Sequence, residues 1–222
     1  MSSYLVDSHK KAWEKEYRSR HNLWAGGVKG LPELPAGAQV LELGCGNGKT
    51  LSAMLGRPWR ITALDISTEA VRLSRLALER KIELLVADVG RLPFRNASFD
   101  AVFAFHVAGH LLISERERMA QEASRVLKED GLLFFRGFEK GDLRAGSGVR
   151  LEPGTFMRGQ GIMTHYFTEP EVEELFGLLE PLSICTSKWK MRIRGEDKIR
   201  SEVAAVFRKS VTEGQGSRNA PG

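Results

Sequence analysis

Residues 42–48 read Glu42-Leu43-Gly44-Cys45-Gly46-Asn47-Gly48, which places a glycine at every second position from 44 to 48. A largely apolar run at 38–41 precedes this segment, and helix-compatible residues at 49–55 follow it. The pattern predicts a buried strand that ends in a glycine-rich turn and then opens a helix. Because glycine has no side chain, such a turn lets a bound ligand approach the bare backbone.

The spacing of the three glycines excludes two common nucleotide motifs. A dinucleotide-binding turn requires G-x-G-x-x-G, and its third glycine would fall at position 49, where the chain has Lys49. A P-loop requires G-x-x-x-x-G-K, and its first glycine would fall at Leu43. The turn therefore predicts a ligand that is neither a dinucleotide nor a nucleoside triphosphate.

Segments with strand and helix patterns alternate through most of the chain. This alternation predicts an α/β fold with a parallel, doubly wound sheet. Ser67 and Thr168 are expected to cap helices, and the spacing of Ser114 and Glu117 predicts a capping box. The glycine-rich segment 139–164 is expected to form a long loop. We expect strands at 40–43, 60–64, 82–87, 99–105, 132–138, 182–192 and 203–208, and helices at 9–20, 49–55, 67–78, 114–127 and 169–176.

The composition is that of a soluble globular protein, since 42% of the 222 residues are hydrophobic and 27% are charged. We expect a single domain over 1–210, with an N-terminal helix or lid at 1–30, a cofactor-binding core at 38–138 and a substrate-side part at 139–210. Residues 211–222 are expected to form a disordered tail. No apolar run approaches the roughly 20 residues that span a bilayer, and no signal-peptide pattern is present. A cytoplasmic protein without membrane contact is therefore expected.

The two cysteines, Cys45 and Cys185, are too few for a disulfide framework, and no Cys/His spacing matches a zinc site. No metal is therefore expected, and Cys45 is interpreted as a small buried side chain within the glycine turn. The net charge of +5 is concentrated in residues 188–209. A basic segment of this kind is a weaker indication of nucleic-acid binding than a chain that is basic throughout.

Acidic residues follow three successive predicted strands: Glu42, Asp65 and Asp88. In open α/β sheets, ligands bind beyond the carboxyl ends of the strands, so these side chains are expected to meet at one edge. Asp65 is suited to accept two ribose hydroxyls, and Asp88 to accept the exocyclic amine of adenine, with the Val89 backbone nearby. Glu42 is suited to hold the turn in place or to meet a cationic group of the ligand.

These motifs, together with Leu92-Pro93-Phe94 and Phe99-Asp100, resemble those of class I S-adenosylmethionine-dependent methyltransferases. The resemblance covers residues 38–138, where five motifs occur in the family's order and spacing. It implies S-adenosylmethionine as cofactor and a Rossmann-like, seven-stranded, mostly parallel sheet with an antiparallel last strand and helices on both faces. The cofactor contacts implied in this way are Glu42, Gly44, Cys45, Gly46, Gly48, Asp65, Ile66, Asp88, Val89, Phe105 and His106.

The N-terminal segment, with Trp13 and Tyr17 followed by Leu23-Trp24, is similar to the start of thiopurine-type and tellurite-resistance-type methyltransferases. In that group an N-terminal helix closes over the cofactor, so the resemblance implies Trp24 as a further cofactor contact. The alternative is simple packing of this helix on the sheet. Residues 161–168 show a second, short similarity to the same group, for which loop anchoring is the alternative. The candidate substrate contacts are Tyr17, His110, His165, Tyr166, Arg192 and Arg194.

Methyl transfer from a sulfonium is an in-line displacement that requires orientation and desolvation, whereas a general base is optional. His106 and His110 both follow the fourth predicted strand and either could act as a base, with His106, directly after the strand, as the better-placed candidate. We expect a small-molecule acceptor with a soft, thiol-like nucleophile, because such an atom needs no strong base. The alternatives are an RNA methyltransferase that uses the basic strand face at 188–194, and a non-enzymatic S-adenosylmethionine-binding regulator.

Overall fold

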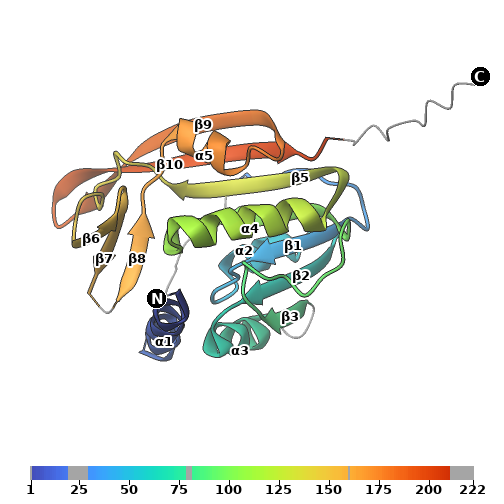
Figure 1. Ribbon diagram of the computed structural model, residues 1–222, viewed down its shortest axis with the longest axis horizontal. Helices are drawn as coiled ribbons and strands as arrows, with labels where there is room; N and C mark the ends of the chain where they lie inside the picture. Colours follow the sequence, from blue (N-terminus) through green and yellow to red (C-terminus); the bar gives the residue numbers. More distant parts are fainter. Residues whose placement is uncertain (1, 20–29, 79–81, 160, 211–222) are drawn as a thin grey trace, which may run out of the picture.

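The computed structural model describes residues 2–19, 30–78, 82–159 and 161–210, and within the first helix it describes side chains from residue 10 onward. Seven strands form one sheet in the order β3-β2-β1-β4-β5-β10-β9 (Figure 1). Six of them run in one direction, and β10 runs against both of its neighbours. The predicted fold is thereby confirmed. The strands are β1 (Gln39–Leu43), β2 (Arg60–Asp65), β3 (Glu83–Val86), β4 (Phe99–Phe105), β5 (Leu127–Phe138), β9 (Glu180–Ile193) and β10 (Glu196–Arg208).

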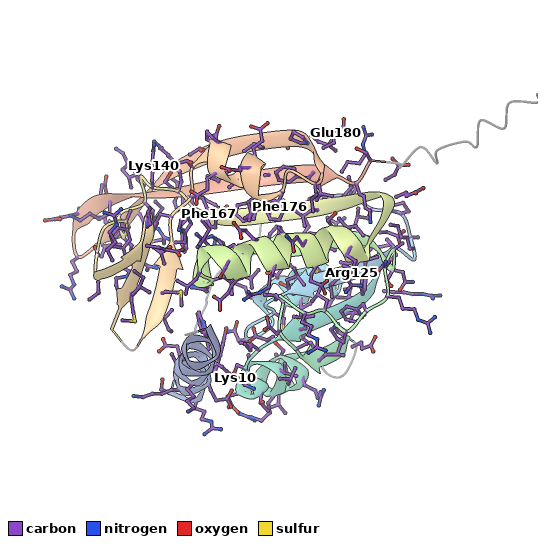
Figure 2. All side chains as sticks on the ribbon, viewed as in Figure 1. Lys10, Arg125, Lys140, Phe167, Phe176 and Glu180 are labelled. Carbon is purple, nitrogen blue, oxygen red and sulfur yellow. The ribbon has the colours of Figure 1, made fainter. Side chains whose placement is uncertain are left out.

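Helices cover both faces of this sheet, and each face has its own apolar core. On one face Leu51 and Met54 of α2 (Lys49–Met54) and Val71 of α3 (Thr68–Ala77) pack in one cluster with β1 and β4. On the other face, α4 (Ile113–Val126) and α5 (Glu169–Leu175) cover β4, β5 and β10. Phe167 and Phe176 lie in this second layer (Figure 2), with ring centroids 5.1 and 5.5 Å from that of Phe135.

Two of the three predicted helix caps are present. The Ser67 hydroxyl accepts a hydrogen bond from the Ala70 N–H, and Thr168 caps α5 in the same way. The capping box expected at Ser114 is wrong, because α4 begins one residue earlier, at Ile113. The Glu115 carboxylate therefore takes the reciprocal position and accepts the Leu112 N–H at 2.9 Å.

The long loop expected at 139–164 is also wrong for much of its length. This segment contains a separate three-stranded antiparallel sheet of β6 (Val149–Glu152), β7 (Thr155–Arg158) and β8 (Ile162–His165). Gly148 and Gly154 have positive φ angles of 107° and 74° and lie where strands begin or turn. The glycines that suggested a loop therefore lie at the boundaries of short strands. Strand β8 contacts the 3₁₀ helix η1 (Ala108–His110) beyond β4.

The N-terminal helix α1 (Ser2–Ser19) lies beside α3 and β8 (Figure 1). Its Glu14 carboxylate accepts hydrogen bonds from the Ser67 hydroxyl at 2.6 Å and the Glu69 N–H at 3.3 Å. Trp13 and Tyr17 are buried with Ala70 of α3. The helix therefore packs on α3 and β8. Among the described residues no helix is both long and apolar enough to cross a membrane.

Candidate active site

The glycine turn after β1 has a backbone that requires glycine. Gly44, Gly46 and Gly48 have φ angles of 73°, 55° and 84°, a region that other L-residues rarely occupy. A Cβ atom on Gly44 would lie 2.8 Å from the Val107 Cγ2, and one on Gly46 would lie 2.7 Å from the Tyr17 hydroxyl. The turn is thus a bare cradle bordered by α1 and by the residues after β4. Cys45 is buried within it, as predicted.

Asp65, at the end of β2, ties this turn to α3. Its Oδ2 accepts the Gly46 N–H and its Oδ1 accepts the Ser67 N–H, both at 2.9 Å. Burial raises the pKa of Asp65 to about 6, while the backbone N–H groups of Ser67, Gly46 and Ile66 act in the opposite direction. Each oxygen has a further lone pair with which it can accept a ligand hydroxyl.

Glu42 is a buried acid next to the glycine cradle, and it is incompletely paired. Its side chain is 2% exposed, and within the described structure its Oε2 has no hydrogen-bond partner. Burial raises the pKa of Glu42 to about 8, partly offset by a hydrogen bond with Thr50. A buried unpaired carboxyl oxygen costs free energy. A ligand that brings a cationic or hydrogen-bond-donating group to this point would remove that cost.

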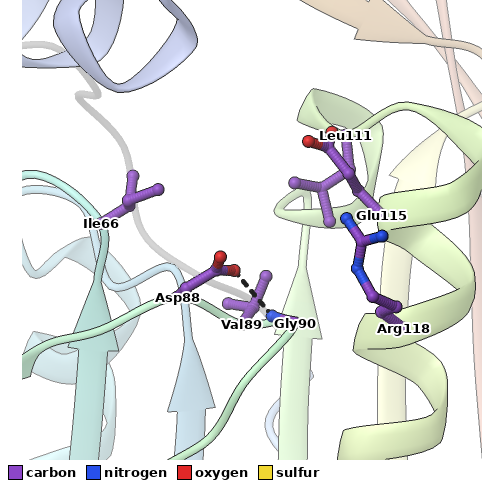
Figure 3. A pocket seen from close by; sticks show the side chains of 7 residues that line it. All are labelled: Ile66, Asp88, Val89, Gly90, Leu111, Glu115 and Arg118. Atoms are coloured by element: carbon purple, nitrogen blue, oxygen red, sulfur yellow. Dashed lines mark hydrogen bonds between the residues drawn. The ribbon is translucent and has the colours of Figure 1, made fainter. Parts of the chain in front are cut away.

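A pocket lies beyond the ends of β2 and β3 (Figure 3). Apolar side chains of Ile66, Val89 and Leu111 line it, and Asp88 stands at its edge with Oδ1 accepting the Gly90 N–H at 2.8 Å. Such a lining suits a flat aromatic base that carries an exocyclic amine. The sequence predicted Ile66, Asp88 and Val89 here. It did not indicate the remaining lining residues, Gly90, Leu111, Glu115 and Arg118.

The cradle, the two buried acids and this pocket follow one another across the carboxyl ends of β1, β2 and β3, which are neighbouring strands. The order suits a ligand with an amino-acid end, a ribose and a purine. The unpaired Glu42 oxygen and the turn without side chains at Gly44 and Gly46, bordered by Val107 and Tyr17, fit S-adenosylmethionine in particular.

His106 follows β4 in a left-handed conformation, with a φ of 63°. Its Nε2 lies 3.1 Å from the Glu202 Oε2 on β10, and its Nδ1 is buried and has no hydrogen-bond partner among the described residues. The ring lies 4.7 Å from the Phe138 ring at the end of β5. The neighbouring Phe105 packs against Phe103 and beneath the Arg136 guanidinium. Sequence reasoning missed Glu202 and Phe138, because both reach this point only through strand pairing.

Three of the candidate substrate residues lie around the same edge of the sheet. Tyr17 stacks on Trp13 and stands over Gly46, and burial raises its pKa well above the usual range. The His110 Nδ1 lies 2.7 Å from the Met163 carbonyl oxygen. Tyr166 is buried, with its ring 6.5 Å from the Phe138 ring.

The remaining candidates lie elsewhere. His165 is buried between Thr155, 2.7 Å from its Nδ1, and Glu171, 2.7 Å from its Nε2, an arrangement that anchors the small sheet to α5. Arg192 and Arg194 are exposed at the tip of the β9–β10 hairpin. The strand face expected at 188–194 is solvated on both sides, because β10 pairs with β5 only from Glu202 onward and the tip extends past the sheet. Trp24 and the tail expected at 211–222 lie outside the described residues.

Comparison with known proteins finds similarity to methyltransferases over part of the chain. Residues 41–135 match the family pattern of a methyltransferase domain. The chain is 25% identical to a S-adenosylmethionine-dependent methyltransferase from Methanosarcina mazei, with a TM-score of 0.68 over 81% of this chain and 95% of that one.

Curated relatives include enzymes with different acceptors. One is tRNA N(3)-methylcytidine methyltransferase Mettl2 of Drosophila melanogaster, 29% identical over 77% of this chain and 58% of its own length. Another is malonyl-[acyl-carrier protein] O-methyltransferase of Herminiimonas arsenicoxydans, 37% identical over 51% of this chain and 42% of its own length. The chain therefore spans about half the length of these relatives.

Proposed function

Because this chain carries a class I S-adenosylmethionine-dependent methyltransferase domain, we propose that it transfers a methyl group from this cofactor to a small molecule. The observation that carries the proposal is the cover over the carboxyl ends of the strands. Helix α1 contacts both α3 and β8, and β8 contacts η1, so the second sheet and the N-terminal helix border the acceptor side together. A site enclosed in this way favours a small acceptor over a macromolecule.

The cofactor supplies a methyl group on a sulfonium, an electrophile with a good leaving group. The chain's own residues then have to bind, orient and exclude water. In the proposal Asp65 accepts the ribose hydroxyls, Asp88 accepts the adenine amine, and Glu42 meets the cationic amino end. Positive charge near Glu42 also favours its ionised form, so binding at neutral pH would release the proton that burial retains.

His106 and Glu202 form the proposed proton-accepting pair. Glu202, 3.1 Å from Nε2, would hold the imidazole so that Nδ1 has a free lone pair for an acceptor proton. The expectation of a soft nucleophile rested on the lack of an evident base, and this pair removes that reason. The proposed acceptor atom is therefore a thiol, hydroxyl or amine.

The RNA alternative has weaker support in the geometry. Several curated relatives are named as tRNA methyltransferases, and Lys188 and Lys190 on β9 are exposed. At the hairpin tip, however, carboxylates pair with cations: Asp197 with Arg192 at 3.6 Å, and Glu196 with Lys198. A surface whose cations already have acidic partners attracts phosphate less strongly.

The test is release of S-adenosylhomocysteine by the wild-type protein with a panel of small thiols, alcohols, amines and acids, run beside bulk tRNA. Turnover with a small compound and none with tRNA is the expected result. Turnover with tRNA alone would replace the proposal with the RNA alternative. Binding of the cofactor without turnover in either arm would favour the regulator.

A further inference from the structure

Three arginines from distant parts of the chain gather around Tyr166. Arg158, at the end of β7, donates a hydrogen bond to the Tyr166 hydroxyl at 3.2 Å. Arg200 of β10 lies over the Phe138 ring, 4.7 Å from its centroid. Arg144, after β5, is half-buried, and its pKa is lowered first by burial and then by the charges of Arg200 and Arg158. The three guanidinium groups therefore share one small region.

Too little negative charge accompanies these cations. Asp142 is fully buried and forms an ion pair of 2.6 Å with the Arg200 Nε. Within the described part of the chain, neither Arg144 nor Arg158 has a carboxylate within ion-pair distance. Like charges gathered in a partly buried site repel each other unless an anion lies between them. The cluster is thus prepared for negative charge that the described residues do not supply.

The Phe138 side chain connects this cluster to the reacting end of the site. Its ring lies 4.7 Å from the His106 ring on one side, 4.7 Å from the Arg200 guanidinium on another, and 6.5 Å from the Tyr166 ring. The Phe138 ring therefore borders both His106 and the arginine cluster. The cluster lies on the acceptor side, beyond β4 and β5, whereas the cofactor cradle lies beyond β1 to β3.

We propose that Arg144, Arg158 and Tyr166 bind an anionic group, a carboxylate or a phosphate, on the methyl acceptor. Arginine matches such groups with paired N–H donors. The Tyr166 oxygen already accepts from Arg158, which leaves its own proton to donate to the anion. Arg200, held in place by its hydrogen bond to Asp142, borders this anion site and adds positive charge to it. This inference rests on the proposed function, since it names the chemical class of acceptor for the same site.

The test is the thermal stability of the protein with bound S-adenosylhomocysteine, measured in inorganic phosphate, in citrate, and in potassium chloride of equal ionic strength. At about ten times its Kd, either anion should raise Tm by about 3–6 °C relative to chloride. Stabilisation by citrate alone would indicate that the site binds a carboxylate group of the acceptor, and stabilisation by phosphate alone would indicate that it binds a phosphate group.

Three variants separate the site from general salt effects. Arg158→Gln and Arg144→Gln should each abolish the anion-dependent rise, while Arg95→Gln, an exposed arginine before β4, should retain it. In chloride alone, Arg158→Gln should be at least as stable as the wild type, because it removes repulsion within the cluster. This second readout detects a variant that has merely misfolded.

Several outcomes would overturn the inference. An equal rise in chloride, or an anion effect that survives in both cluster variants, would show that the arginines bind no specific anion. Loss of bulk RNA binding in Arg158→Gln, without any small-anion effect in the wild type, would exclude a small acceptor. The proposed function is tested apart from this by calorimetry. If S-adenosylhomocysteine does not bind at all, the proposed function fails. If it binds but the anions have no effect, only the anion subsite is refuted.

Discussion

The two halves of the site differ in their titratable groups. On the cofactor half, beyond β1 to β3, the buried acids Glu42 and Asp65 have raised pKa values of about 8 and about 6. On the acceptor half, beyond β4 and β5, Arg144, Arg158 and Arg200 gather around Tyr166. Acids predominate in the first half and arginines in the second, where Asp142 pairs with Arg200 alone, and a ligand with complementary groups would offset the cost of burying them. In the proposed account, each ligand is stabilised because it brings a complementary group to side chains that the protein alone leaves poorly compensated.

The largest expected effect comes from filling the cradle on the cofactor half. Gly46→Ala should weaken S-adenosylhomocysteine binding by a factor of about 30 or more and lower Tm, because a Cβ atom would lie 2.7 Å from the Tyr17 hydroxyl. Gly37→Ala is a matched control, since Gly37 also has a positive φ, 81°, but a Cβ atom there would have no heavy atom within 4 Å. Calorimetry and thermal unfolding measure both. Equal loss of binding in the two variants would attribute the effect to backbone strain alone.

The next effect concerns the acceptor half and depends on a turnover substrate. Glu202→Gln should lower kcat by about 10-fold or more with little change in KM, because the carboxylate orients His106 in the proposed mechanism. Glu180→Gln, which removes a carboxylate paired with Arg208 on the same hairpin, is the control. A rise in KM at constant kcat would instead assign Glu202 to substrate binding.

The acidic half also predicts a pH dependence of stability. The folded-state pKa of Glu42, about 8, is above the ordinary glutamate pKa of 4.5, so the folded protein holds the proton more tightly than the unfolded chain. The unliganded protein should therefore lose stability as pH rises from about 4.5 to about 8. Asp65 should add a further loss of stability as pH rises from about 4 to about 6, because its pKa is also raised in the folded protein.

Glu42→Gln isolates this contribution. Between pH 6 and pH 8 the free energy of unfolding of this variant should fall by about 2 kcal/mol less than that of the wild type, since one pKa unit corresponds to about 1.4 kcal/mol. Denaturant unfolding at pH 5, 6 and 8 measures it, and the slope below pH 6 that belongs to Asp65 should persist. Glu196→Gln, an exposed carboxylate at the hairpin tip, should leave the profile unchanged. A wild-type profile that is flat from pH 6 to pH 8 would contradict a buried protonated Glu42.

The smallest effect is expected where cations are exposed. Replacing both Arg192 and Arg194 by Gln should change the free energy of unfolding by less than about 0.5 kcal/mol. Binding of S-adenosylhomocysteine and the anion-dependent rise in Tm should also stay unchanged, because both side chains lie at the exposed hairpin tip. A marked loss of either property would indicate that the acceptor site lies nearer the β9–β10 hairpin tip.

The cofactor half could be predicted from sequence because it depends on local order. The glycine turn, Asp65 and Asp88 each follow a strand directly, and a parallel sheet brings successive strand ends to one edge. The acceptor half depends on contacts between distant residues. Glu202 reaches His106 only through the pairing of β10 with β5, and Arg158 belongs to strands whose glycine-rich sequence indicated a loop. His165 also matched a family pattern, yet its side chain is buried, with Thr155 2.7 Å from its Nδ1 and Glu171 2.7 Å from its Nε2.

The most direct test of the account is calorimetric titration of the wild type and of Asp65→Ala with S-adenosylhomocysteine, with Asp197→Ala at the exposed hairpin turn as control. Asp65 connects the glycine turn to α3 through two backbone hydrogen bonds and is the proposed ribose acceptor. The account predicts one binding site in the wild type and the control, and binding at least about 30-fold weaker in Asp65→Ala. Absence of binding in the wild type, or equal affinity in all three proteins, would contradict it.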